Sequence, residues 1–158
     1  MGRRSAGLMA ATLALVLFAC NPPAGTGPDE GSHPASKMEI IPVVIATKNG
    51  SHTIRAELAD TPERQARGLE GRGELRPDEA MLFPNDKPTA QVFWTKDTKF
   101  PVDIVFVGLD GRVTNIVAMA EPDSDTQLFS VGSTSGTLEM RGGRAAQLGI
   151  EPGDEVTW

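Results

Sequence analysis

Charged side chains gather in one stretch of the sequence, between apolar runs at residues 92–94 and 104–107. If both runs are buried strands, the segment between them is held on a rigid frame, which is a common way to build a binding surface. Charged side chains from other parts of the chain could reach the same surface. The candidate ligand-binding residues are Trp94, Lys96, Asp97, Asp103, Arg67, Arg72 and Glu139.

Two of these residues, Asp103 and Glu139, could act together as an acid and a base. Two carboxyl groups about 5–9 Å apart in an open cleft are the machinery of a glycoside hydrolase. In the structural alternative, Asp103 caps the start of a strand beside Pro101, and Glu139 forms an ion pair with Lys96 or an arginine. The sequence favours the structural alternative, so a catalytic pair remains the second hypothesis.

Trp94 is also open to two interpretations. An exposed indole between Lys96 and arginine side chains would be a platform for a sugar ring or for a partner's chain. A buried indole would be an ordinary part of the core. Since Val92 and Phe93 point to either side of the strand, one face is core, and the sequence leaves the position of Trp94 undecided.

Other common site chemistries lack the residues they need. His52 is the one histidine of the predicted domain, which leaves no serine triad and no histidine-based zinc site. Cys20 is the only cysteine, so the chain has no intrachain disulfide and no CxxC site. Asp110 and Gly111 offer one carboxylate in a tight turn, far short of a calcium site. We therefore predict neither a metal nor a cofactor.

The charge balance argues against nucleic acid as a partner. The 158 residues include 15 lysines and arginines against 21 acidic residues, a formal net charge of −6. Residues 1–19 hold Arg3, Arg4 and no acid, so without them 13 basic residues face 21 acidic ones, and the charge is −8. A general nucleic-acid binder needs a basic surface.

Residues 1–19 are typical of a signal peptide. A short basic start precedes an apolar run of 11 residues at 8–18, the length of a signal-peptide core and well short of the roughly 20 residues that span a bilayer. Residues 17–20, LFAC, resemble the bacterial lipoprotein processing site, in which the cysteine receives the lipid. The alternative is an ordinary signal peptide with an incidental cysteine at its end.

The lipoprotein resemblance implies that diacylglycerol is attached to Cys20, with palmitate or a similar chain on its amine. At about 0.8 kcal/mol per buried CH₂, two acyl chains hold a protein at a membrane stably. Residues 21–37 are rich in Pro, Gly, Ser and Thr, so residues 20–37 are predicted to be a lipidated cysteine and a flexible tether. We expect a protein of the cell envelope, lipid-anchored on the extracytoplasmic side, in the periplasm or at the cell surface.

Residues 38–158 are predicted to form a single globular domain. Alternating apolar residues predict two antiparallel strands, 41–45 and 54–58, with a hairpin turn between them. Asp60 or Thr61 begins a short helix that ends at Gly68. The pattern indicates an α+β domain, mostly antiparallel β, barrel-like and with two short helices. Further strands are expected at residues 81–83, 92–94, 104–107, 113–119, 137–141 and 156–158, a second helix at 144–148, and loops at 72–79 and 121–135.

Several ordered motifs between residues 59 and 156 resemble the prokaryotic family catalogued as domain of unknown function 192. The resemblance implies a small, mostly β domain, often found behind a secretion signal, and it assigns no function. The motifs are Ala59-Asp60-Thr61-Pro62-Glu63-Arg64, Arg67-Gly68-Leu69, Met81-Leu82-Phe83, Phe93-Trp94 with Lys96 and Thr98, Pro101 with Asp103-Ile104, Asp110-Gly111, Leu138-Glu139, and Gly149-Ile150 with Gly153-Asp154.

Two segments depart from the family pattern. Residues 68–72 read GLEGR where the family usually has Gly-Leu-Met and then an aromatic residue before arginine. Residues 93–98 read FWTKDT where the family usually has Phe-Trp-Met-Lys-Asn-Thr. Two methionines are thus lost, and an amide becomes an acid. If those methionines line a ligand surface, the surface of this member is more polar.

Two functions of different classes follow from the sequence. The first is a non-enzymatic ligand- or partner-binding accessory domain of the envelope, which binds a small molecule, a glycan or an envelope protein through the surface around Trp94. The second is a carboxylate-based hydrolase that acts on an envelope or extracellular glycan. Carboxylates each locked to a cation would favour the first function, and an open cleft holding Asp103 and Glu139 would favour the second. The sequence favours the first.

Overall fold

The computed structural model describes residues 1–2 and 38–158. The chain divides into two units, Met1–Gly31 and Ser32–Trp158, and the fold lies in the second. Cys20, the tether and nearly all of the predicted signal peptide lie outside the described residues. No helix of the described residues is long and apolar enough to cross a membrane.

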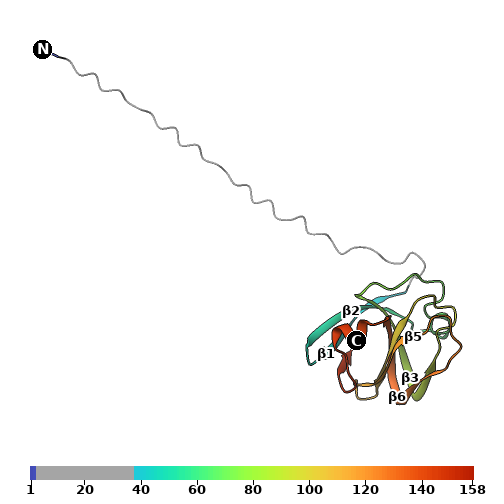
Figure 1. Cartoon of the computed structure of the whole chain (residues 1–158). Coiled ribbons are helices and arrows are strands. Elements are labelled where there is room, and N and C mark those ends of the chain that lie inside the picture. The colour runs from blue at the N-terminus through green and yellow to red at the C-terminus, as the bar shows by residue number, and fades with distance from the viewer. Residues whose placement is uncertain (3–37) are drawn as a thin grey trace. The chain divides into compact units, whose positions relative to one another are not determined.

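Within residues 38–158, seven strands form one sheet that curls into a half-barrel (Figure 1). The strand order is β5-β4-β6-β3-β2-β1-β7, and every neighbouring pair is antiparallel except β2 and β3, which run parallel. The predicted fold class, mostly antiparallel β and barrel-like with two short helices, is confirmed, and the parallel pair makes the sheet mixed. The elements are β1 (Ile40–Thr47), β2 (Gly50–Leu58), α1 (Pro62–Arg67), β3 (Glu79–Phe93), β4 (Val102–Gly108), β5 (Val113–Ala120), β6 (Leu128–Arg141), α2 (Arg144–Leu148) and β7 (Glu155–Thr157).

The two edge strands of the sheet, β5 and β7, approach each other at one end. The backbone N–H of Val113 donates to the carbonyl of Asp154 at 2.9 Å, and the N–H of Val156 donates to the carbonyl of Gly111 at 2.8 Å. These bonds occupy backbone groups that an open sheet edge would leave unpaired. They draw the half-barrel toward closure at this end.

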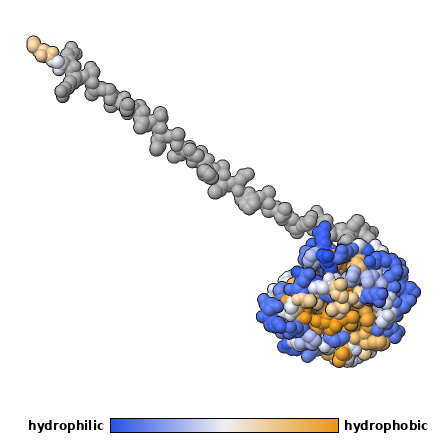
Figure 2. Space-filling view, in the orientation of Figure 1, coloured by the Kyte–Doolittle hydropathy of each residue, from blue (hydrophilic) through white to orange (hydrophobic). Residues whose placement is uncertain are grey.

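The sheet separates two apolar clusters, and the central strand β4 contributes to both. Val105 and Val107 belong to one cluster, which also includes the buried side chains of α2. Ile104 and Phe106 belong to the other cluster. Because successive side chains of a strand point to opposite faces, a strand buried on both sides reads as a continuous apolar run. The predicted buried strand at residues 104–107 is therefore confirmed. On the face shown in Figure 2, an apolar area extends from the middle of the domain to its lower edge, with hydrophilic residues on both sides.

Two strands are longer than the sequence predicts. The run at residues 81–83 does not end at Pro84, because β3 continues past the proline through a shift of register between Pro84 and Thr89. A proline fits beside such an irregularity since its missing N–H is not needed there. Likewise, β6 begins at Leu128, inside the segment predicted to be a loop. The first half of β6 is mostly exposed, so its sequence lacks the alternation that marks a half-buried strand.

Both helices form where they are expected. The hydroxyl of Thr61 accepts a hydrogen bond from the backbone N–H of Arg64 at 3.3 Å, which caps α1, and Gly68 follows the last residue of that helix. Gly149, in the left-handed conformation, ends α2. The side chain of Gln65 in α1 donates to the carbonyl of Pro84 in β3 at 2.9 Å, so this helix lies beside the middle of β3.

Candidate functional site

A pocket of about 270 Å³ opens between α1, β3 and the segment that follows β3, with β6 behind it. Four of the seven candidate residues line it: Arg67, Trp94, Lys96 and Glu139. The remaining lining residues are Gln65, Ala66, Gly68, Leu69, Phe83, Pro84, Asn85, Gln91, Val92, Phe93 and Thr98.

Glu139 supplies the buried acid of this pocket. It lies in the middle of the sheet on β6, directly opposite Met81 of β3 and Ile104 of β4, and its side chain is 5% exposed. Within the described residues its carboxyl group has no hydrogen bond and no ion pair, so the predicted salt bridge to Lys96 or an arginine is wrong. Burial raises the pKa of Glu139 to about 8, and at neutral pH the group is therefore mainly protonated.

Two positively charged side chains, Arg67 and Lys96, line the pocket. Lys96 follows β3 and its Nζ lies 3.7 Å from a carboxylate oxygen of Asp125, an exposed pair that leaves the ammonium in solvent. Arg67, the last residue of α1, is exposed, and among the described residues no acidic side chain pairs with it. The charged groups that line the pocket besides Glu139 are thus both positive.

Trp94 comes directly after β3 and is 51% exposed, so the platform interpretation of this residue fits the structure and the core interpretation does not. Val92 is exposed beside it, which corrects the prediction of a fully buried strand at residues 92–94. Phe93 alone turns inward, and its ring packs edge-on against Phe83 and Phe106, with ring centres 5.2 and 5.8 Å away. This packing fixes the end of β3 and hence the position of Trp94.

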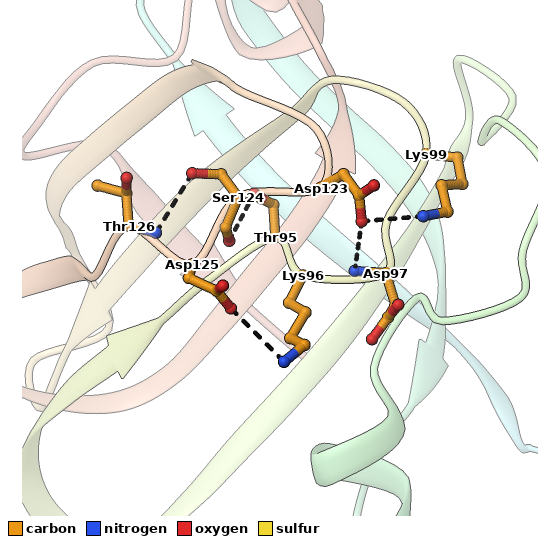
Figure 3. A network of polar contacts seen from close by, with 8 residues as sticks. All are labelled: Thr95, Lys96, Asp97, Lys99, Asp123, Ser124, Asp125 and Thr126. Carbon is orange, nitrogen blue, oxygen red and sulfur yellow. Dashed lines mark hydrogen bonds and ion pairs between the residues drawn. The ribbon is translucent and has the colours of Figure 1, made fainter.

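The segment after β3 is held in place by a second loop (Figure 3). The backbone N–H of Thr95 donates to the carbonyl of Ser124 at 3.2 Å, and its hydroxyl donates to the carbonyl of Glu121. Asp123 accepts from the backbone N–H of Asp97 at 3.2 Å and from Lys99 at 2.9 Å. The hydrogen bond from Lys99 is the main cause that lowers the pKa of Asp123. The loop therefore presents Trp94 and Lys96 on a fixed frame.

The departures from the family pattern lie outside the pocket. Thr95 is buried, and its hydroxyl donates to the carbonyl of Glu121 in the neighbouring loop. Glu70 is exposed and does not line the pocket. Asp97 has a positive φ of 62°, a conformation that Asn and Asp adopt more readily than other side chains. The expected increase in polarity of the ligand surface is therefore not seen at these positions.

Three candidate residues are not brought to the pocket. Asp97 lies outside the pocket lining, where its backbone N–H donates to Asp123. Arg72 forms a two-bonded ion pair with Glu57, and its side chain is 5% exposed, so its charge is used within the fold. Asp103 faces the opposite side of the sheet from Glu139, because it pairs with Met140 while the next residue, Ile104, pairs with Glu139. The second hypothesis, in which Asp103 and Glu139 act as a catalytic pair, does not fit this arrangement.

Asp103 instead holds α2 against the sheet. Its side chain is fully buried and accepts backbone N–H bonds from Met119 at 2.8 Å, Gly143 at 2.9 Å and Ala145 at 2.8 Å. The last two groups lie at the start of α2, where N–H groups lack partners within the helix. The role is structural, as the sequence favours, but Asp103 caps a helix distant in sequence and not its own strand.

Sequence reasoning missed three amides of the pocket, Gln65, Asn85 and Gln91. The side-chain nitrogen of Gln65 donates to the carbonyl of Pro84 at 2.9 Å, and that of Gln91 donates to the hydroxyl of Thr89 at 3.0 Å. Amides on a helix end and an irregular strand carry no sequence signal of their own.

Within the described residues, no group of three or more His, Cys, Asp and Glu side chains could hold a metal ion.

Two solved structures are similar to this chain in sequence and fold. A protein of unknown function from Novosphingobium aromaticivorans is 48% identical, with a TM-score of 0.78 over 80% of this chain and 90% of that one. A candidate transcription regulator from Sinorhizobium meliloti is 30% identical, with a TM-score of 0.74 over 77% of this chain and 95% of that one. No curated protein matches.

The family comparison covers most of the domain. Residues 44–158 match the family model DUF192, described as an uncharacterized ACR. This range includes every strand except the start of β1, both helices, and all residues that line the pocket. The chain therefore belongs to the domain of unknown function 192 family.

Proposed function

We propose that this protein is a non-enzymatic binding or accessory module of the cell envelope, and that the pocket beside Trp94 holds a small ligand. The observation that carries the proposal is that Arg67, Trp94, Lys96 and Glu139, from three separate elements, line one pocket of about 270 Å³. Concave sites with apolar walls and a few convergent polar groups are the usual form of small-molecule sites.

The composition of the pocket supports binding over hydrolysis. Glu139 is the one carboxyl group among the lining residues, whereas hydrolysis of a glycosidic bond by the usual route needs two. Asp103 cannot supply the second, since its three N–H bonds hold it on the other face of the sheet. A single neutral acid can still bind a ligand by hydrogen bonds.

The envelope location in this proposal depends on the N-terminal sequence. The processing site at residues 17–20, the lipid on Cys20 and the polar tether would present the pocket outside the cytoplasm, joined to a membrane. The net charge of −8 beyond residue 19 favours a small molecule, a glycan or an envelope protein over nucleic acid.

A thermal-shift screen tests the pocket. A ligand that binds only the folded state must raise the unfolding midpoint by mass action. The panel should contain sugars, cell-wall fragments, small organic acids, amines and divalent metals, each measured on the wild type, Trp94→Ala and the matched control Trp158→Phe. We expect a shift that Trp94→Ala removes and Trp158→Phe keeps. No shift with any member of the panel, or shifts equal in both variants, would contradict the proposal.

A further inference from the structure

The geometry of the pocket points to an acidic sugar of about monosaccharide size as its ligand, with the sugar ring on Trp94, the carboxylate at Arg67, and hydroxyl groups on Glu139 and the pocket amides. This inference rests on the proposed binding function and names its ligand class. The volume of about 270 Å³ is just below the roughly 300–1,000 Å³ of sites for drug-sized ligands, which favours one ring over a chain.

Glu139 is a hydrogen-bonding group of the pocket that has no partner among residues 38–158. Glu139 is 5% exposed, and the strands on either side present Met81 and Ile104 to it, neither of which can pair with a carboxyl group. A buried polar group without a partner costs free energy, and a ligand that supplies the partner recovers that cost. A neutral carboxylic acid both donates and accepts, as a hydroxyl group does, so the two match.

Two amides of the pocket also have a hydrogen-bonding atom without a partner among the described residues. Gln65 and Gln91 each use the side-chain nitrogen within the protein, at Pro84 and Thr89 respectively. Within the described residues, no hydrogen bond reaches the side-chain oxygen of either amide. Amide oxygens are acceptors, and the O–H groups of a sugar are donors. One edge of the pocket can therefore accept from several hydroxyl groups.

The opposite wall suits the other surface of a sugar ring. Trp94 and Val92 are both exposed and both line the pocket, so they offer a flat aromatic ring and an aliphatic side chain to a ligand. A pyranose carries C–H groups on its faces and hydroxyl groups around its edge. A ligand with both kinds of surface fills a pocket that is aromatic on one side and polar on the other.

The charges at the pocket select an acid over a base. Arg67 comes from α1 and Lys96 from the segment after β3, and these are the two charged residues besides Glu139 that line the pocket. An ammonium ligand would meet two positive charges, which disfavours it. A carboxylate would meet the guanidinium group of Arg67, whose paired N–H groups suit a carboxylate. Burial raises the pKa of Glu139, so its neutral form does not repel the acid.

Titration of the full-length protein with defined sugars tests this inference. The acidic probes are D-glucuronate, D-galacturonate and N-acetylmuramate, the neutral probes are D-glucose and D-galactose, and benzoate is the acid without a sugar ring. Binding is followed by calorimetry, and by fluorescence in a Trp158→Phe background, where Trp94 is the remaining tryptophan. We expect at least one acidic sugar to bind roughly tenfold tighter than its neutral counterpart.

Variants separate the roles of the residues. Arg67→Gln, an exposed change, should reduce affinity for the acidic sugar roughly tenfold, while Lys48→Gln, the same charge change at the turn between β1 and β2, should not alter it. In the wild type, affinity should fall as the pH rises through about 8, where Glu139 ionises and repels the ligand, and in Glu139→Gln this fall should vanish.

Two results would overturn the inference. One is the absence of binding by all three acidic sugars up to about 20 mM, a concentration that would reveal even very weak affinity. The other is equal or tighter binding of the neutral sugars or of benzoate, which would assign a different ligand class to the pocket. The second result leaves the proposed binding function in place, whereas the broad thermal-shift panel decides that function separately.

Discussion

Replacement of Glu139 by glutamine should change how the stability of this protein depends on pH. The carboxyl group is buried in the sheet, has no partner among the described residues, and keeps its proton up to a pKa of about 8. In the unfolded chain a glutamate has an ordinary pKa of 4.5. Glutamine has nearly the same shape and never ionises, so Glu139→Gln removes this titration and little else.

The sign follows from which state holds the proton. Below pH 4.5 the carboxyl group of Glu139 is protonated in both the folded and the unfolded state, so this group contributes nothing to the pH dependence of stability. Between about 4.5 and 8 the unfolded state loses its proton while the folded state keeps it, so the free energy of unfolding falls by up to about 1.4 kcal/mol for each pH unit. Above pH 8 both states are ionised and the loss is complete.

The full difference between the two pKa values corresponds to roughly 5 kcal/mol. This figure is an upper bound, since Glu139 lines a pocket and water that enters the pocket solvates the ionised group. Domains of this size are stable by about 5–15 kcal/mol, so the effect is a large part of the total. We expect wild type and Glu139→Gln to have similar stability near pH 4.5, and the variant to be the more stable by several kcal/mol at pH 8 and above.

Urea unfolding between pH 4.5 and 9, followed by tryptophan fluorescence, measures this difference. A constant denaturant slope shows that the change lies in stability and not in the compactness of either state. Glu155→Gln is the matched control, because that side chain is exposed and should alter the pH profile little. If the profiles of wild type and Glu139→Gln run parallel over the whole range, Glu139 is not a buried neutral acid, and the argument for the back of the pocket fails.

Three further predictions concern the frame and the anchor. Asp103→Asn should lower the free energy of unfolding by about 2–4 kcal/mol in urea, because an amide oxygen cannot accept all three backbone N–H bonds; an unchanged value would contradict its role at α2. Arg72→Met should cost about 2 kcal/mol, since it removes two charge-assisted hydrogen bonds to Glu57, whereas Lys48→Met, at an exposed pair, should leave the thermal midpoint almost unchanged; equal effects would refute the distinction. Cys20→Ser should abolish lipid attachment in cells, and recovery of that variant with label from radioactive palmitate in the membrane fraction would exclude the lipoprotein proposal.

The elements that could be predicted from the sequence are those with a clear local signal, such as apolar alternation, a turn or a helix cap. The strands around residues 41–45 and 54–58 have period-two alternation and a hairpin turn, and both form with the expected antiparallel pairing. The first helix has a capping threonine and a final glycine, and it forms between them. The exposed halves of β3 and β6 have no such signal, because they pair with each other while most of their side chains face solvent.

The candidate site was predicted in part for a related reason. Charge and aromatic character single out Trp94, Lys96 and Arg67 in the sequence, and the structure brings these side chains to one pocket with Glu139. The sequence does not show on which face of a central strand an acid lies. That depends on register, and a shift of one residue moves every side chain to the opposite face.

The two central carboxylates illustrate how the structure separates a scaffold residue from a binding residue. Asp103 and Glu139 lie one register position apart on neighbouring strands, and both are almost completely buried. Asp103 accepts three backbone N–H bonds, two of which fasten the start of α2 to the sheet. In the part of the chain that the structure describes, Glu139 has no such donor, and it lines a pocket. An acid that the fold leaves unsatisfied lowers stability at neutral pH, and such groups are concentrated at functional sites. The missing partner of Glu139 is therefore the strongest reason to look for the ligand of this protein in that pocket.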